Sequence, residues 1–145
     1  MPRGKHYDWG NGPAELDPHS VTKHDVLAGY IRRYLEQRTL NARGRERLKI
    51  TLVDGFCGGG LYKIRGNDKL VHGSPLRMLA AVEEARVLIN QARTKPIELD
   101  AQYVFIDKDA KACTSRRSWL NKDTPAPSGS PSISYMMILP PLRPP

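Results

Sequence analysis

The chain has 145 residues, a length typical of one domain with a buried core. Its 23 Lys and Arg against 15 Asp and Glu give a net charge of +8, so nucleic acid is a plausible partner, although charge alone does not establish one. Cys57 and Cys113 form no CxxC pair, and no apolar run is long enough to span a bilayer. We therefore expect no metal site, no membrane association and a cytoplasmic location.

Residues 1–18 are rich in Gly, Pro, Asp and Asn and lack an apolar period, which predicts an extended N-terminal arm anchored by Trp9 and Leu16. Ser20 can cap a helix after this arm. The apolar positions of that helix recur at three and four residues and are Leu27, Ile31, Tyr34 and Leu35, flanked by Val26 and Tyr30. A basic surface loop is expected from residue 39 to residue 49.

An apolar run at residues 50–53 ends in Asp54 and is followed by a glycine-rich turn at residues 55–60. The run is typical of a buried parallel strand, and the glycines allow backbone geometry that other residues resist. No Gly-Lys-Ser/Thr follows, which argues against a phosphate-binding P-loop. Lys63 stands where a dinucleotide fingerprint has its third glycine, so that interpretation weakens too.

The spacing Asp54-x-Phe56-x-Gly58-x-Gly60 resembles instead the first motif of class I S-adenosylmethionine-dependent methyltransferases. In that motif the glycines let the backbone approach the amino acid part of the cofactor. The candidate cofactor-binding residues of this turn are Asp54, Gly55, Phe56, Gly58 and Gly60. The alternative is a tight connection between a strand and a helix that binds no ligand.

Residues 63–72 show no periodicity and predict a mobile loop. A helix should begin with Ser74 as its cap and Pro75 at its first position, and its apolar stripe is Met78, Leu79, Val82, Ala85 and Ile89. A second strand at residues 101–106 then ends in Asp107, completing a βαβ unit. Asp107, or Asp109 in its place, could bind ribose hydroxyls, and the alternative role is to cap the next helix.

An ordered set of residues now resembles the three-Cys-motif partner protein family over residues 7–113. The set comprises Trp9, Pro18-His19-Ser20, Lys23-His24, Leu27, Tyr30, the Asp54 to Gly60 motif, Tyr62, Gly73-Ser74-Pro75 and Phe105-x-Asp107. Cys57 and Gly59 stand where the family has alanine and proline or serine. The resemblance implies a bacterial protein with a methyltransferase-like, Rossmann-like fold, encoded beside a partner protein that carries the three-cysteine motif.

Seven of the 12 prolines lie in residues 114–145, a composition that predicts a disordered tail. The expected organisation is therefore an arm (1–18), an incomplete Rossmann-like domain (19–113) and this tail. Such a chain is interpreted as truncated or frameshifted after about residue 113. The competing explanation is a natural proline-rich tail that docks on a partner.

Two functions follow from these expectations. The first is a methyltransferase-like protein in which the turn binds S-adenosylmethionine and Asp107 binds its ribose. This fragment is then expected to be inactive, because it contains no recognisable catalytic residue. The second is a non-catalytic interaction module that works through a partner protein.

Overall fold

The computed structural model describes residues 7–40, 46–123 and 135–138. Its elements in chain order are β1 (Ala14–Leu16), α1 (Pro18–Leu40), β2 (Arg47–Asp54), β3 (Leu61–Ile64), β4 (Leu70–His72), α2 (Ser74–Asn90), β5 (Glu98–Ile106), α3 (Ala110–Asp123) and β6 (Tyr135–Ile138). The α/β class expected from the sequence is confirmed. No helix in the described ranges is both long and apolar enough to cross a membrane.

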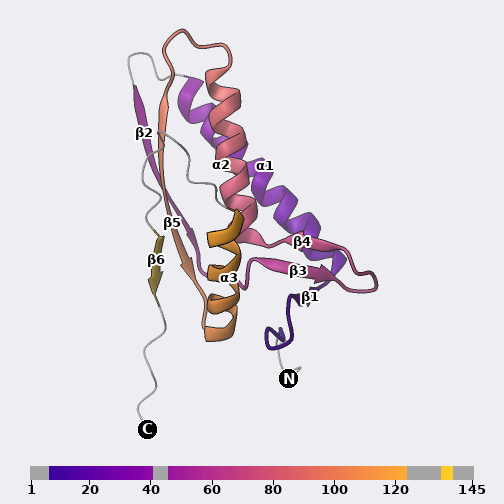
Figure 1. Ribbon diagram of the computed structural model, residues 1–145. Helices are drawn as coiled ribbons and strands as arrows, with labels where there is room; N and C mark the ends of the chain where they lie inside the picture. Colours follow the sequence, from indigo (N-terminus) through magenta and orange to yellow (C-terminus); the bar gives the residue numbers. More distant parts are fainter. Residues whose placement is uncertain (1–6, 41–45, 124–134, 139–145) are drawn as a thin grey trace.

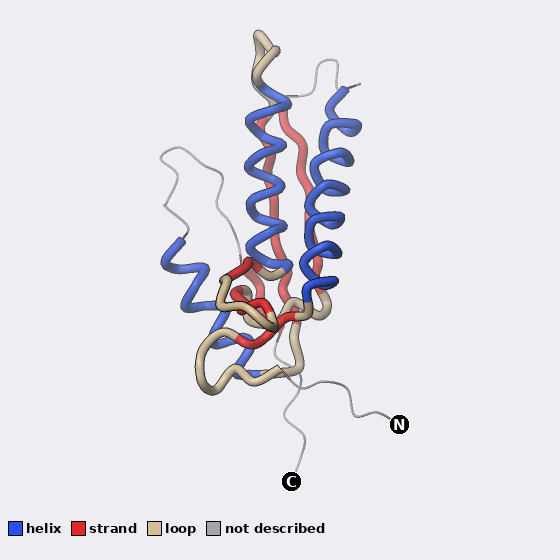
Figure 2. The backbone as a smooth tube through the Cα atoms, turned by 90° about the vertical axis from the view of Figure 1, so that its right-hand side faces the viewer, coloured by secondary structure: helices blue, strands red, loops and turns tan. Residues whose placement is uncertain are grey.

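The larger sheet has the strand order β2-β5-β6, and both of its strand pairs are parallel. Parallel neighbours need a crossover connection, which α2 provides between β2 and β5 and α3 provides between β5 and β6. Helices α1 and α2 lie side by side on one face of this sheet (Figures 1 and 2). The expected succession of strand, glycine turn, helix and strand is therefore confirmed.

The main core lies between this sheet and the two long helices. Every second residue of β5 is buried, from Leu99 to Phe105, as the period of two in a strand requires. The stripe expected on α2 is confirmed: Met78, Val82, Ala85 and Ile89 are buried, and Leu79 packs against them. The expected cap is wrong, because Gly73 occupies the cap position and makes no side-chain cap hydrogen bond.

A second, small sheet has the order β1-β3-β4. It corrects two expectations, since part of the N-terminal arm forms β1, and the predicted loop at residues 63–72 is the end of β3, a turn and β4, which pair antiparallel. The two predicted anchors of the arm are confirmed, because Trp9 and Leu16 are both buried. They pack with Tyr62 in a separate hydrophobic cluster, and this burial offsets the cost of ordering the arm.

Helix α1 begins at Pro18, two residues before the predicted cap Ser20. Proline suits a first helical turn because its missing N–H has no partner there in any case. Ile31 and Leu35 are buried as expected, but Tyr34, which belongs to the same predicted stripe, is exposed. Ala28 and Thr39 complete the buried side, while the exposed side chains include Val26, Tyr30 and Tyr34.

The tail boundary predicted at residue 113 is also wrong. Helix α3 continues to Asp123, because no proline interrupts it before Pro125 and because Ala112, Cys113 and Arg116 bury its inner side. Strand β6 lies within the same predicted tail and pairs with β5. The remainder of the predicted disordered tail, residues 124–134 and 139–145, lies outside the described residues.

Candidate functional site

The candidate site lies where β2 and β5 end side by side. Asp54 is the last residue of β2 and pairs in register with Phe105, two residues before Asp107. The carboxyl ends of neighbouring parallel strands are where open α/β sheets bind ligands. The structure thus brings together the two acids that the sequence analysis selected.

The glycine turn has left-handed backbone geometry at two of its predicted residues. The φ angles are 61° at Gly58 and 88° at Gly60, which L side chains rarely adopt. The Gly58 N–H donates to Asp107 Oδ2 at 2.9 Å, and the Cys57 N–H donates to the Ile106 carbonyl oxygen at 3.2 Å. The end of β5 therefore holds the turn in place.

Aromatic side chains fill the space beside these glycines. A Cβ added to Gly59 would lie 2.5 Å from two ring carbons of Trp9, and one added to Gly73 would lie 2.5 Å from a ring carbon of Tyr62. A Cβ on Gly58 would overlap the Tyr62 hydroxyl. At these positions the missing side chain makes room for the protein's own rings, whereas nothing lies within 4 Å of a Cβ placed on Gly55.

Both candidate carboxylates already accept hydrogen bonds inside the chain. Asp54 Oδ1 accepts from the Phe56 N–H at 3.1 Å, and Asp54 Oδ2 accepts from the Ser74 hydroxyl. Asp107 accepts from the Gly58 N–H and, at 2.9 Å, from the Asp109 N–H, which precedes α3. A carboxylate has about four acceptor sites, so capacity for a ligand remains at each acid.

Phe56 and Gly55 form the open part of the turn. The Phe56 side chain is 93% exposed, the highest exposure among the large apolar residues described. Such a ring has no packing role in the described fold. Together with the free space at Gly55, it leaves one side of the turn accessible to a ligand or a partner.

Arg116 is a site residue that the sequence analysis missed, because it placed this position in the tail. It lies beneath the turn and is only 1% exposed. Its Nη1 donates to the Gly58 carbonyl oxygen at 3.1 Å and to the Cys57 sulfur, and its guanidinium lies 5.7 Å from the centre of the Phe105 ring. Nη2 has no hydrogen-bond partner within the described structure.

Burial raises the pKa of the Cys57 thiol to about 12, although the positive charge of Arg116 acts in the opposite direction. A protonated thiol fits its contacts, since Cys57 Sγ donates to the Ile106 carbonyl oxygen at 3.2 Å while it accepts from Arg116. A neutral thiol is a poor nucleophile. Cys57 therefore contributes packing to the turn.

An aromatic cluster from the N-terminal arm borders the site. The ring centres of Trp9 and Tyr62 are 5.0 Å apart, and Tyr7 lies 5.6 Å from Tyr62. Burial raises the pKa of Tyr62. Beside these rings is an open pocket of about 490 Å³ lined by Tyr7, Asp8, Trp9, Lys108, Asp109, Ala110 and Lys111. The sequence offered no signal for Tyr7, since the arm has no period.

The two parallel crossovers, with acids and a glycine turn at the strand ends, define an α/β protein with a candidate ligand site. Comparison with protein families, curated proteins and solved structures finds no match. Among the described residues, no group of three or more His, Cys, Asp or Glu could hold a metal ion.

Proposed function

We propose that this chain is a Rossmann-like, S-adenosylmethionine-binding protein of the methyltransferase type. The observation that supports this most directly is the placement of Asp54, the glycine turn and Asp107 at the adjacent ends of two parallel strands joined by α2. The order β2-β5-β6, with crossovers through α2 and α3, fits one half of a doubly wound sheet.

The residues fit the cofactor on one side of the turn. Asp54 retains acceptor capacity for an ammonium group, and the free space at Gly55 lets a ligand approach the backbone. Tyr7 offers a partly exposed ring at a pocket that also contains Asp109, the alternative ribose-binding acid. An aromatic face next to a carboxylate suits a nucleoside, whose base stacks and whose diol donates hydrogen bonds.

The test is calorimetric titration of the purified chain with S-adenosylmethionine. Asp54→Ala should abolish the heat of binding. Ser74→Ala is the matched control, because it removes the same internal hydrogen bond to Asp54 but leaves the carboxylate. Absence of binding to the wild-type chain, or binding unchanged by Asp54→Ala, would refute the proposal.

The same proposal holds that this chain transfers no methyl group by itself. The sequence contains no recognisable catalytic residue after the turn, and Cys57 is held as a protonated thiol. Methyl transfer by the purified chain to nucleic acid or protein acceptors would contradict this part.

The second candidate is a non-catalytic interaction module. Its support is that Trp9 and Tyr62 fill the space at three glycines of the site, and that both acids serve internal hydrogen bonds. The partner would be a three-Cys-motif protein or, because of the net charge of +8, a nucleic acid. Co-purification with the partner, without any heat from S-adenosylmethionine, would favour this candidate over the first.

A further inference from the structure

His24, near the beginning of α1, is a half-buried histidine that the proposed function does not use. Its ring centre lies 6.3 Å from that of Tyr62, the residue whose hydroxyl reaches Gly58 in the glycine turn. Its Nδ1 is buried and has no hydrogen-bond partner within the described part of the chain. Buried polar atoms are normally paired, so an unpaired imidazole nitrogen beside the candidate site requires an explanation.

Burial has the largest effect on the His24 ring and lowers its pKa from the ordinary value of 6.5. The negative charge of Asp54, at the end of β2, and a hydrogen bond with the backbone of His72, at the end of β4, act to raise this pKa. Arg77 on α2 lowers it further, and Asp25 on α1 acts to raise it. The ring is therefore neutral at pH 7 and carries a charge only in more acidic solution.

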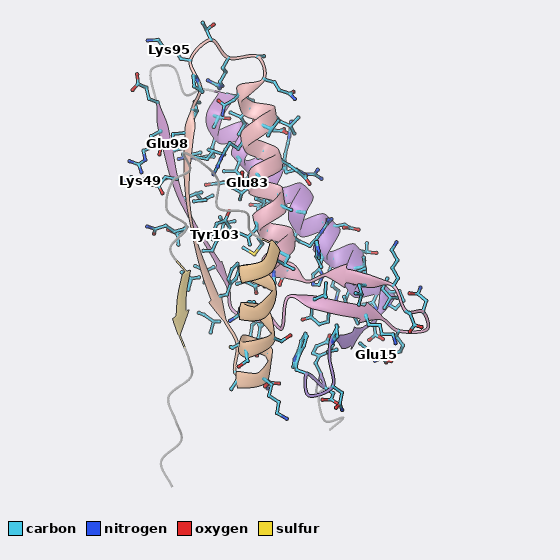
Figure 3. The ribbon with its side chains drawn as sticks, viewed as in Figure 1. Glu15, Lys49, Glu83, Lys95, Glu98 and Tyr103 are labelled. Atoms are coloured by element: carbon cyan, nitrogen blue, oxygen red, sulfur yellow. The ribbon has the colours of Figure 1, made fainter. Side chains whose placement is uncertain are left out.

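The other acids near these elements already pair with arginines. Asp25 forms an ion pair with Arg77, the cation that also faces the His24 ring. Glu15 lies on β1, at the edge of the small sheet opposite β4 (Figure 3), and pairs with Arg65 at 3.4 Å. Neither carboxylate offers an uncompensated negative charge to His24.

Asp54 differs from these acids, because both of its hydrogen bonds come from neutral donors. These donors are the Phe56 N–H and the Ser74 hydroxyl. No ion pair of Asp54 is present among the described residues, so its negative charge is uncompensated and acceptor sites remain on its oxygens. A protonated His24 therefore has Asp54 as its natural partner.

We propose that His24 makes ligand binding at Asp54 depend on pH, because the protonated ring competes with the ammonium group of the ligand for the same carboxylate. This inference rests on the proposed function, in which Asp54 binds that ammonium group. While the imidazole is neutral, the charge of Asp54 attracts the ligand alone. A proton from solvent at Nδ1 turns the unpaired atom into a donor and places a second positive charge beside the carboxylate.

The expected effect follows from the fraction of the chain with a neutral His24. If the neutral form alone binds, the dissociation constant for S-adenosylmethionine is constant above pH 6.5. It then rises by up to about tenfold for each pH unit below the folded pKa of His24.

The test is calorimetric titration of the full chain with S-adenosylmethionine from about pH 5 to about pH 7.5, the range in which histidine changes its charge. Affinity should fall in acid for the wild type and should not depend on pH in His24→Asn, which stays neutral. His72→Gln is the matched control, because it removes an exposed histidine next to His24 and should keep the wild-type profile. Far-UV circular dichroism at each pH confirms that the chain stays folded.

A second measurement needs no ligand. Titration of the His24 ring protons, followed by NMR, gives the pKa of this histidine directly. Asp54→Asn should lower that pKa, because it removes the negative charge that raises it. Glu15→Gln is the matched control and should leave it unchanged, since Glu15 pairs with Arg65.

The possible failures are distinguishable. Absence of S-adenosylmethionine binding at every pH overturns the proposed function and this inference with it. Binding with the same pH profile in the wild type and in His24→Asn overturns this inference alone. So does a pKa of His24 that Asp54→Asn leaves unchanged.

Discussion

The contact between Gly59 and Trp9 allows the sharpest test of how the N-terminal arm is fastened to the glycine turn. Gly59→Ala places a methyl group less than 3.0 Å from three ring carbons of Trp9, closer than Cβ atoms lie to other atoms in real structures. Gly59 does not have positive φ, so alanine meets no backbone strain there. Any loss of stability therefore reports the clash with the ring.

Two costs set the expected loss of stability in Gly59→Ala. Overpacking of this kind costs about 1–3 kcal/mol. The chain can relieve it by releasing Trp9, which caps the cost near the roughly 3–5 kcal/mol expected for truncation of a buried tryptophan. We expect Gly59→Ala to lower the free energy of unfolding by about 2 kcal/mol in the wild-type background.

The effect of Gly59→Ala on the free energy of unfolding should change sign in a chain that lacks the Trp9 ring. In a Trp9→Ala background the added methyl group has free space, and a glycine-to-alanine change at a compatible backbone stabilises by about 0.4–1 kcal/mol through the unfolded state. The two substitutions should then be coupled by about 3 kcal/mol. A coupling energy of this size indicates direct contact between residue 59 and the Trp9 ring. A turn that is merely sensitive to any substitution would show no coupling to Trp9.

The assay is urea unfolding of the four chains, followed by far-UV circular dichroism because two of them lack Trp9. Gly55→Ala is the matched control, since nothing lies within 4 Å of its added Cβ. Equal losses for Gly59→Ala in both backgrounds would refute the packing of Trp9 on the turn.

The further predictions concern three groups around the turn. Asp107→Asn should lower the free energy of unfolding by about 1–3 kcal/mol, because its amide N–H would face a backbone N–H, such as that of Gly58, where a carboxylate oxygen now accepts. If urea unfolding shows no loss, the hydrogen bond from the Gly58 N–H to Asp107 is excluded. Burial raises the pKa of the Cys57 thiol from its ordinary value of 9.0 to about 12 in the folded chain. The stability that this thiol contributes should therefore be complete below pH 9 and fall as the pH rises from 9 toward 12, and Cys57→Ala should lack this pH dependence. The same thiol should resist alkylation at pH 8 until the chain unfolds. Burial lowers the pKa of His24 from 6.5, so the stability it contributes should be present above pH 6.5 and be lost as the pH falls below it, a loss that is absent in His24→Asn.

The sequence by itself determined the elements whose signals are local. The apolar run before Asp54, the glycines of the turn and the period of α2 each depend on neighbouring residues, and the structure confirms the strand and helix they predict. The two acids at the strand ends were also found this way, because a strand must end where its apolar run ends. Composition was less reliable, since the prolines suggested a tail from residue 114, whereas α3 continues to Asp123 and β6 pairs with β5.

Only the tertiary structure decided which neighbours these elements meet. Trp9 reaches Gly59 from fifty residues away in the sequence, and Arg116 lies under Gly58 from α3. On α1 the period identified apolar residues, but the positions of α2 and β2 determined that Leu35 is buried and Tyr30 is exposed. Periodicity gives the spacing of a face, whereas burial depends on what packs against it, and that information lies in distant parts of the chain.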